Sequence, residues 1–175
     1  GSRLKLYGYL RLDSDWDSAP TNDIRLPQWV RSSDRATGGK DKDSSFALHP
    51  RLTRFGLDLQ GLKLERLWDG TVSGKLETDF HNGGSESRQI IRIRHAFLKV
   101  AWGDLNLLAG QTWDIISPLW PTPNHDTLMW NAGNLGDRRP QFRLSYEPKV
   151  GPGRLSLVAG AALSDYFDVP FVFEV

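Results

Sequence analysis

Apolar and polar residues alternate with a period of two along most of the chain. In residues 4–12 the even positions are apolar or Gly, and the odd positions are basic or Tyr. Such alternation places the two sets on opposite faces of a β-strand. An eighth strand over 171–175 is weaker, because Pro170 suits only a sheet edge or a strand start. Between the strands at 4–12 and 171–175, the same alternation predicts strands over residues 54–60, 71–80, 90–102, 105–113, 141–147 and 154–164.

Within residues 90–102 the apolar positions change parity. Ile91 and Ile93 are apolar before Ala96, whereas Leu98 and Val100 are apolar after it. A one-residue β-bulge near Ala96 would explain the change, because one extra residue moves the following side chains to the other face. No window keeps a 3.6-residue apolar stripe over three turns, so no helix of any length is expected.

The connections between these strands alternate in length. Two of them, 13–49 and 114–139, are long, and 81–89 is intermediate. The connections at 65–70, 103–104 and 148–153 are short. Long loops at one end of antiparallel strands and short turns at the other are typical of an outer-membrane β-barrel. A soluble β-sandwich has no reason to separate its loops in this way.

Aromatic residues fall near the strand ends. Trp68, Trp102 and Tyr146 lie beside the short turns, and Phe80 and Trp113 lie beside the long loops. Two girdles of interfacial aromatics would produce this distribution. The alternative interpretation is that aromatic residues are common in any strand. A soluble β-sandwich that binds carbohydrate through exposed Trp therefore stays open as a second function.

Composition narrows the classes without deciding between these two. The chain has 175 residues, no Cys, a net charge of +1 and a mean hydropathy of −0.44. The charge balance gives no general attraction for nucleic acid. No stretch reaches the roughly 18 apolar residues of a transmembrane helix. A membrane barrel remains compatible, because its lumen-facing residues are polar and lower the mean hydropathy.

Six sequence segments also resemble a known family in order and spacing. The segments are 6–13, 53–57, 74–80, 93–98, 108–113 and 138–143. On these segments the chain resembles the outer-membrane diffusion-porin superfamily, in particular the N-terminal half of dicarboxylate-type porins, from about residue 5 to residue 147. The resemblance implies a barrel of about 16 strands, usually trimeric, in the outer membrane of a Gram-negative bacterium.

A barrel of that size needs well over roughly 300 residues. We therefore expect residues 1–175 to be one partial all-β, antiparallel, up-and-down transmembrane barrel domain with seven or eight strands. The alternative is a complete eight-strand barrel that serves as an anchor or adhesin. The expected partners are outer-membrane lipid, small anionic or polar solutes and, through the resemblance, further copies in a homotrimer.

Charged residues on the polar faces are expected to point into a lumen. A charged side chain at mid-depth in lipid costs about 2–4 kcal/mol, so these residues should avoid the lipid face. Basic and acidic residues that line one pore select charged, polar solutes. The alternative is that they pair with one another and only stabilise the wall. The predicted pore-lining residues are Arg54, Lys75, Glu77, Asp79, Arg92, Arg94 and Arg143.

The long connection at 114–139 is the candidate constriction loop. In the porins that the chain resembles, the loop at this place folds into the barrel and narrows it. Arg138 and Arg139 carry guanidinium groups suited to carboxylates, so small anions such as dicarboxylates are the expected solutes. An ordinary surface loop is the alternative. The candidate residues of the loop are Asp114, Trp120, His125, Asp126, Trp130, Asp137, Arg138 and Arg139.

Other chemistry has little support. The four His have no metal-ligand spacing, and neither a metal nor another cofactor is expected. Asp13, Asp15 and Asp17 begin a calcium-loop pattern, but the Gly and Glu that complete it are missing, so only weak calcium binding stays open. Glu77 and Asp79 could supply a general acid and base. Two carboxylates on a charged wall are more often structural, and no enzyme is predicted.

Overall fold

The computed structural model describes residues 1–19, 21, 30, 44–81, 84–85, 88–115, 138–163 and 172–174. These residues form one antiparallel sheet of eight strands in the order β1-β4-β5-β8-β9-β10-β13-β14. Each strand pairs with the sheet strand that precedes it in the sequence, as an up-and-down barrel wall requires. The strands are β1 (Arg3–Tyr9), β4 (Arg54–Leu64), β5 (Gly70–Asp79), β8 (Arg92–Trp102), β9 (Leu105–Trp113), β10 (Arg138–Tyr146), β13 (Leu157–Ala162) and β14 (Val172–Glu174).

All eight predicted sheet strands are present, and the all-β, partial-barrel fold class is confirmed. A 3-10 turn, η3 (Glu65–Leu67), joins β4 to β5. No helix among the described residues is long and apolar enough to cross a membrane. The remaining strands form three two-stranded pairs, β2 (Asp13–Asp17) with β3 (Ser45–His49), β6 (Gly84–Ser85) with β7 (Arg88–Gln89), and β11 (Lys149–Val150) with β12 (Gly153–Arg154).

Some predicted boundaries differ from the structure. The segment 13–49 was expected to be a loop throughout, but its two ends pair as β2 and β3. The segment 114–139 ends earlier than expected, because Arg138 and Arg139 already pair with β9. Arg154 was expected to begin the strand over residues 154–164, but it lies in the β11–β12 hairpin. In each case the boundary is set by hydrogen bonding to a neighbouring strand, which the alternation of apolar and polar residues does not reveal.

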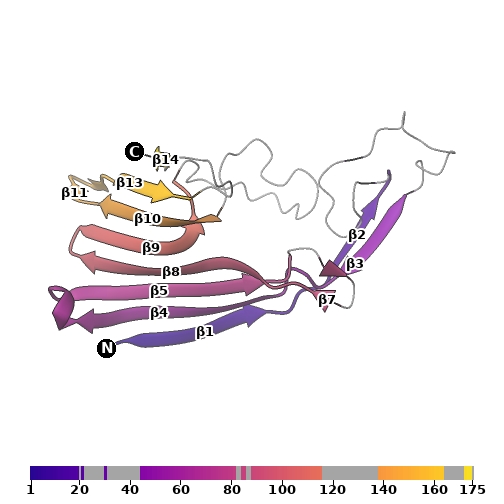
Figure 1. Cartoon of the computed structure of the whole chain (residues 1–175), viewed down its shortest axis with the longest axis horizontal. Helices are drawn as coiled ribbons and strands as arrows, with labels where there is room; N and C mark the ends of the chain where they lie inside the picture. Colours follow the sequence, from indigo (N-terminus) through magenta and orange to yellow (C-terminus); the bar gives the residue numbers. More distant parts are fainter. Residues whose placement is uncertain are drawn as a thin grey trace.

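The connections separate by length between the two ends of the sheet. The short turns that join β4 to β5, β8 to β9 and β10 to β13 lie at one end in Figure 1. The longer connections that follow β1, β5 and β9 leave from the opposite end, where β2 and β3 project away from the sheet (Figure 1). This arrangement is the one predicted from the spacing of the strands.

The two faces of the sheet are inverted relative to a water-soluble protein. Large apolar side chains are exposed on one face, and most of the buried side chains are polar or charged. In a soluble sheet the apolar face would be buried. An exposed apolar face with polar groups inside is the pattern of a strand wall in contact with lipid. The exposed outer-face side chains include Leu6, Phe55, Leu57, Leu76, Leu98, Leu107, Phe142, Leu144 and Leu157.

Strand register keeps charged and apolar positions apart. Leu57 pairs with Leu76, while the next pair along, Asp58 with Lys75, points to the other face. A single-residue slip would move every apolar side chain of a strand into the inner face. The register predicted for β4, β5 and β10 is therefore confirmed.

Candidate functional site

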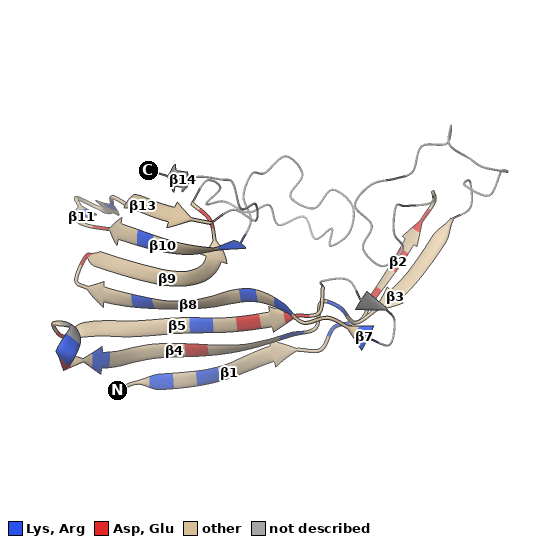
Figure 2. Ribbon diagram, viewed as in Figure 1, with Lys and Arg blue, Asp and Glu red and all other residues tan. Residues whose placement is uncertain are grey.

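The inner face carries charged residues from adjacent strands. Alternation along β5 directs Lys75, Glu77 and Asp79 to this face, and the register places Asp58 of β4 and His95 of β8 beside them. Figure 2 shows charged residues on β1, β4, β5 and β8, which lie side by side in the sheet. Residues far apart in the sequence therefore meet in one polar cluster, which we call the inner-wall network.

Tyr7 of β1 connects three strands of this network. Its ring lies over Gly56 of β4, at the position that a side chain there would occupy. The Tyr7 hydroxyl donates a hydrogen bond to Glu77 Oε2 at 2.8 Å and accepts one from Lys75 Nζ at 2.9 Å. Lys75 also forms an ion pair with Asp58, with Nζ 3.0 Å from Oδ1. Gly56 thus allows an aromatic ring from the edge strand to reach the charges on β5.

Two carboxylates hold the arginines of β8. Arg94 donates to Glu77 Oε1 from Nε and to Asp79 Oδ2 from Nη1, both at 2.8 Å. Arg92 donates to both carboxylate oxygens of Asp79, from Nε to Oδ1 at 2.8 Å and from Nη2 to Oδ2 at 2.7 Å. Arg54 of β4 forms an ion pair with Glu77, with Nε 3.5 Å from Oε1. The Asp79 carboxylate is fully buried, so these bonds replace the solvation that it would have in water.

A β-bulge makes this arrangement possible. The pairing of β5 with β8 shifts between Glu77 and Thr78, and Arg94 is the extra residue between Ile93 and His95. The predicted bulge is confirmed, but it lies at Arg94 and not at the expected position near Ala96. It lets the consecutive residues Arg94 and His95 both face inward, where His95 Nδ1 lies 3.0 Å from Thr112 Oγ1.

A second set of inner-face contacts lies on β9 and β10. Arg143 bonds to Gln141 Oε1, at 3.1 Å from Nε and 2.8 Å from Nη2, and also donates to the carbonyl oxygen of Trp113. The buried Gln141 amide in turn donates to the carbonyls of Thr112 and Trp113, both at 3.0 Å. The sequence analysis missed Gln141, although its position two residues before Arg143 places it on the same face.

The described end of the candidate constriction loop contacts this region. Arg139 forms an ion pair with the buried Asp114, with Nε 3.3 Å from Oδ2. Arg138 is buried and its guanidinium lies 4.3 Å from the centre of the Trp113 ring, a cation–π contact. The other candidate loop residues, Trp120, His125, Asp126, Trp130 and Asp137, lie outside the described residues.

The connection that follows β5 holds a buried histidine, His81. Burial, together with the positive charges of Arg92 and Arg51, lowers the pKa of His81 from its ordinary 6.5 to about 4. The backbone N–H of His81 donates to Asp79 Oδ1 at 3.2 Å. His81 is therefore neutral at physiological pH, and it adds no cation beside the arginines.

Two of the three aspartates of the possible calcium pattern, Asp13 and Asp15, already have partners. Asp13 accepts from Arg11 Nε at 2.7 Å, and Asp15 Oδ2 lies 2.9 Å from His49 Nε2. Within the part of the chain that the structure describes, no group of three or more His, Asp or Glu residues could hold a metal ion. Weak calcium binding at these aspartates gains no support from this geometry.

The carboxylates of the inner wall are matched by cations, and further cations are left over. Asp58, Glu77 and Asp79 each hold at least one Lys or Arg. Lys5 and Lys99 share this face and have no ion-pair partner among the described residues. The described wall thus carries a positive excess. The network supplies ordered charge along a polar surface, whereas a role in contacting solute stays a prediction for each of its residues.

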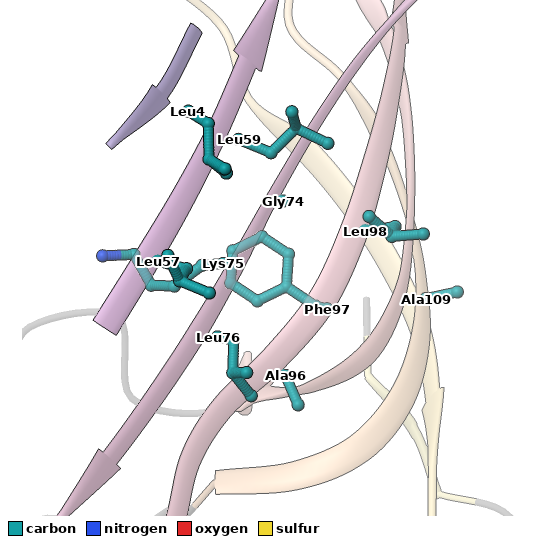
Figure 3. Close-up of a pocket in the computed structure, with 10 residues that line it drawn as sticks. All are labelled: Leu4, Leu57, Leu59, Gly74, Lys75, Leu76, Ala96, Phe97, Leu98 and Ala109. Atoms are coloured by element: carbon teal, nitrogen blue, oxygen red, sulfur yellow. The ribbon is translucent and has the colours of Figure 1, made fainter. Parts of the chain in front are cut away.

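The outer face has a shallow apolar hollow of about 470 Å³. Figure 3 shows the side chains around it, among them Leu4, Leu57, Leu76 and Leu98, with Gly74 near its centre. A Cβ at Gly74 would lie 2.7 Å from Leu98 Cδ2, so the glycine leaves room for the Leu98 side chain beside β5. Most of its lining residues are apolar, and Lys75 of the inner-wall network also borders it.

Comparison with known proteins supports this picture of the wall. No protein-family model and no curated protein matches the chain. Its structure is similar to the crystal structure of the outer membrane channel DcaP of Acinetobacter baumannii, with a TM-score of 0.67 and 28% sequence identity. The alignment covers 94% of this chain and 42% of DcaP, so the chain spans less than half of that protein's length.

The chain is related to the porin type of outer-membrane protein. The predicted location in the outer membrane of a Gram-negative bacterium is confirmed by the same likeness. The protein that it resembles is a channel and not an enzyme. The more specific resemblance to dicarboxylate-type porins, and the homotrimer that it implies, stay predictions.

Proposed function

We propose that the chain forms part of the wall of a passive outer-membrane channel for small hydrophilic anions such as dicarboxylates. The observation that carries the proposal is the charge balance of the inner face. Each described carboxylate of the wall is already bound by Lys or Arg, while Lys5 and Lys99 add positive charge without a partner among the described residues. A positive excess in a narrow polar channel attracts anions and repels cations.

Arg139 and Arg143 are the proposed solute-contacting arginines. Both occupy inner-face positions of β10, beside the described start of the candidate constriction loop. Gln141 holds the Arg143 guanidinium from one side. Binding a carboxylate would therefore cost less conformational entropy than binding it with a mobile side chain. A guanidinium held in this way suits a planar carboxylate better than a mobile lysine would.

The test is the reversal potential of the full-length channel in a planar bilayer under a salt gradient. The wild-type channel is expected to prefer anions, and the Arg139→Ala/Arg143→Ala variant is expected to lose much of that preference. Arg154→Ala is the matched control, because this arginine is exposed in the β11–β12 turn, away from the wall. A wild-type channel that prefers cations, or a double variant with unchanged selectivity, would contradict the proposal. Absence of conductance would favour an anchor.

A further inference from the structure

The β2–β3 hairpin has an apolar face that no described residue covers. Trp16 pairs with Phe46 across the hairpin, and Ser14 pairs with Leu48. Trp16 is 67% exposed, Phe46 61% and Leu48 58%. We call these three side chains the hairpin patch. Two aromatic rings and a leucine on one side of a five-residue hairpin need a nonpolar or interfacial environment.

The opposite face of the hairpin is polar and internally paired. Asp15 bonds to His49 at 2.9 Å, and Asp13 forms an ion pair with Arg11 at 2.7 Å. The hairpin is therefore amphipathic, with its charges satisfied on one side and its apolar residues on the other. Because the charged side chains pair with one another on the polar face, the apolar face is the one available to contact another molecule.

The hairpin patch continues the lipid-facing side of the sheet. From β1 into β2 most even positions are apolar and exposed, namely Leu6, Leu10, Leu12 and Trp16, with Gly8 and Ser14 between them. On the returning strand Phe46 and Leu48 are even, whereas Phe55 and Leu57 are odd. A turn in between, closed by the bond from Thr53 N to the Pro50 carbonyl at 2.9 Å, shifts the parity. The apolar residues of both strands can thereby stay on one continuous outer face.

Strand length places the patch beyond the hydrocarbon core. A transmembrane strand needs about 9–11 residues. β4 with 11 residues and β5 with 10 already meet this need. Figure 1 shows β2 and β3 past the outer end of these strands. The patch therefore lies past the membrane-spanning strands, on the side of the lipid headgroups, and amphipathic aromatic rings are favoured in the headgroup region.

We propose that Trp16, Phe46 and Leu48 bind outer-leaflet lipid at the boundary between acyl chains and headgroups. The hairpin would then lie against the membrane surface and extend the lipid contact of β1 and β4. The proposal rests on the outer-membrane location of the chain and not on the solute that the channel passes, so the two can fail separately. A second copy of the chain, or water, is the occupant that the test must distinguish from lipid.

Fluorescent labels on adjacent residues provide the test. These 175 residues have no Cys, so Phe46→Cys and Ala47→Cys each add one labelling site to this part of the wall, on the apolar and the polar face respectively. Any Cys elsewhere in the channel is first replaced by Ser. Each variant of the full-length channel is labelled with an environment-sensitive nitrobenzoxadiazole dye. It is then placed in phosphatidylcholine vesicles that contain lipid with a nitroxide near the headgroup.

The label at position 46 is expected to emit at shorter wavelength than the label at 47 and to be quenched more strongly by the nitroxide lipid. Leu48→Cys, on the same face, should repeat the result if Phe46→Cys fails to fold. Equal quenching of positions 46 and 47 by aqueous iodide, with no lipid effect, would overturn the proposal. Protection from both iodide and nitroxide lipid would also overturn it, because a protein neighbour would then cover the patch.

Discussion

Asp79→Asn tests whether the inner-wall network holds the sheet together. The substitution keeps the shape of the side chain but removes the charge that both Arg92 and Arg94 bind, at 2.7 and 2.8 Å. Asp79 has no exposed surface, and the side chains of the two arginines are 18% and 12% exposed. Two cations would therefore stay behind in a largely dry site, without the charge of the carboxylate oxygen Oδ2 that now accepts from Arg92 Nη2 and Arg94 Nη1.

The expected loss of stability is large for one atom exchanged. Removing one partner of a buried ion pair typically costs about 3–5 kcal/mol, because the remaining charge is left uncompensated. Asp58→Asn is the matched control. The Asp58 and Lys75 side chains are 20% and 31% exposed, so water can solvate a lone Lys75. An accessible pair of this kind contributes less than about 1 kcal/mol.

The measurement is the free energy of unfolding of the full-length channel in vesicles, from a urea titration followed by the heat-dependent gel migration of folded barrels. Asp79→Glu restores the charge with a longer side chain and should recover part of the loss. If Asp79→Asn were no more destabilising than Asp58→Asn, then burial would not govern the strength of the network, and the structural interpretation of Glu77 and Asp79 would be wrong.

Three further predictions concern orientation, the lipid face and pH. In whole cells a cysteine at Ser18 should react with an impermeant reagent while one at Asp104 does not, because short turns face the periplasm; the reverse pattern would invert the barrel. Leu98→Arg, near the middle of β8 on the outer face, should lower the free energy of unfolding in vesicles by about 2–4 kcal/mol. The control Lys99→Arg, on the inner face, should change it little. Equal effects of the two substitutions would contradict the register. His81 has a pKa of about 4 in the folded chain against 6.5 in the unfolded chain, so the unfolded chain binds the extra proton and stability falls as pH drops through this window. His81→Gln should weaken that pH dependence in the same urea titration, and an unchanged pH dependence would contradict the burial of a neutral His81.

Strand positions could be predicted from the sequence because lipid imposes a strict rule on each residue. A strand between lipid and a polar lumen must alternate, and residues 71–80 and 141–147 do so without interruption. The bulge was harder to place. Arg94 and His95 are both polar, so the sequence gives no sign of which one is the extra residue, and only the pairing with β5 decides it.

The partners within the network could not be predicted for the same reason. Strand alternation showed that Arg92, Arg94 and Asp79 share a face, but the choice of partner depends on a register that is shifted by the bulge. Tyr7 bonds to Glu77 across 70 positions of sequence, and its path depends on the absence of a side chain at Gly56. No local pattern in the sequence contains that information.

The two parts of the described wall differ in the groups that hold their arginines. On β4, β5 and β8, carboxylates and arginines neutralise one another, and a paired charge produces only a weak field at the distance of a passing solute. On β10, Arg143 donates to the side-chain oxygen of Gln141 and to the carbonyl oxygen of Trp113, and neither of these two groups carries a charge. The number of arginines on a porin wall is consequently a poor guide to selectivity. We expect the kind of group that holds each one to be the better guide, because a carboxylate partner, such as Asp114 beside Arg139, weakens the field of an arginine more than an uncharged partner does.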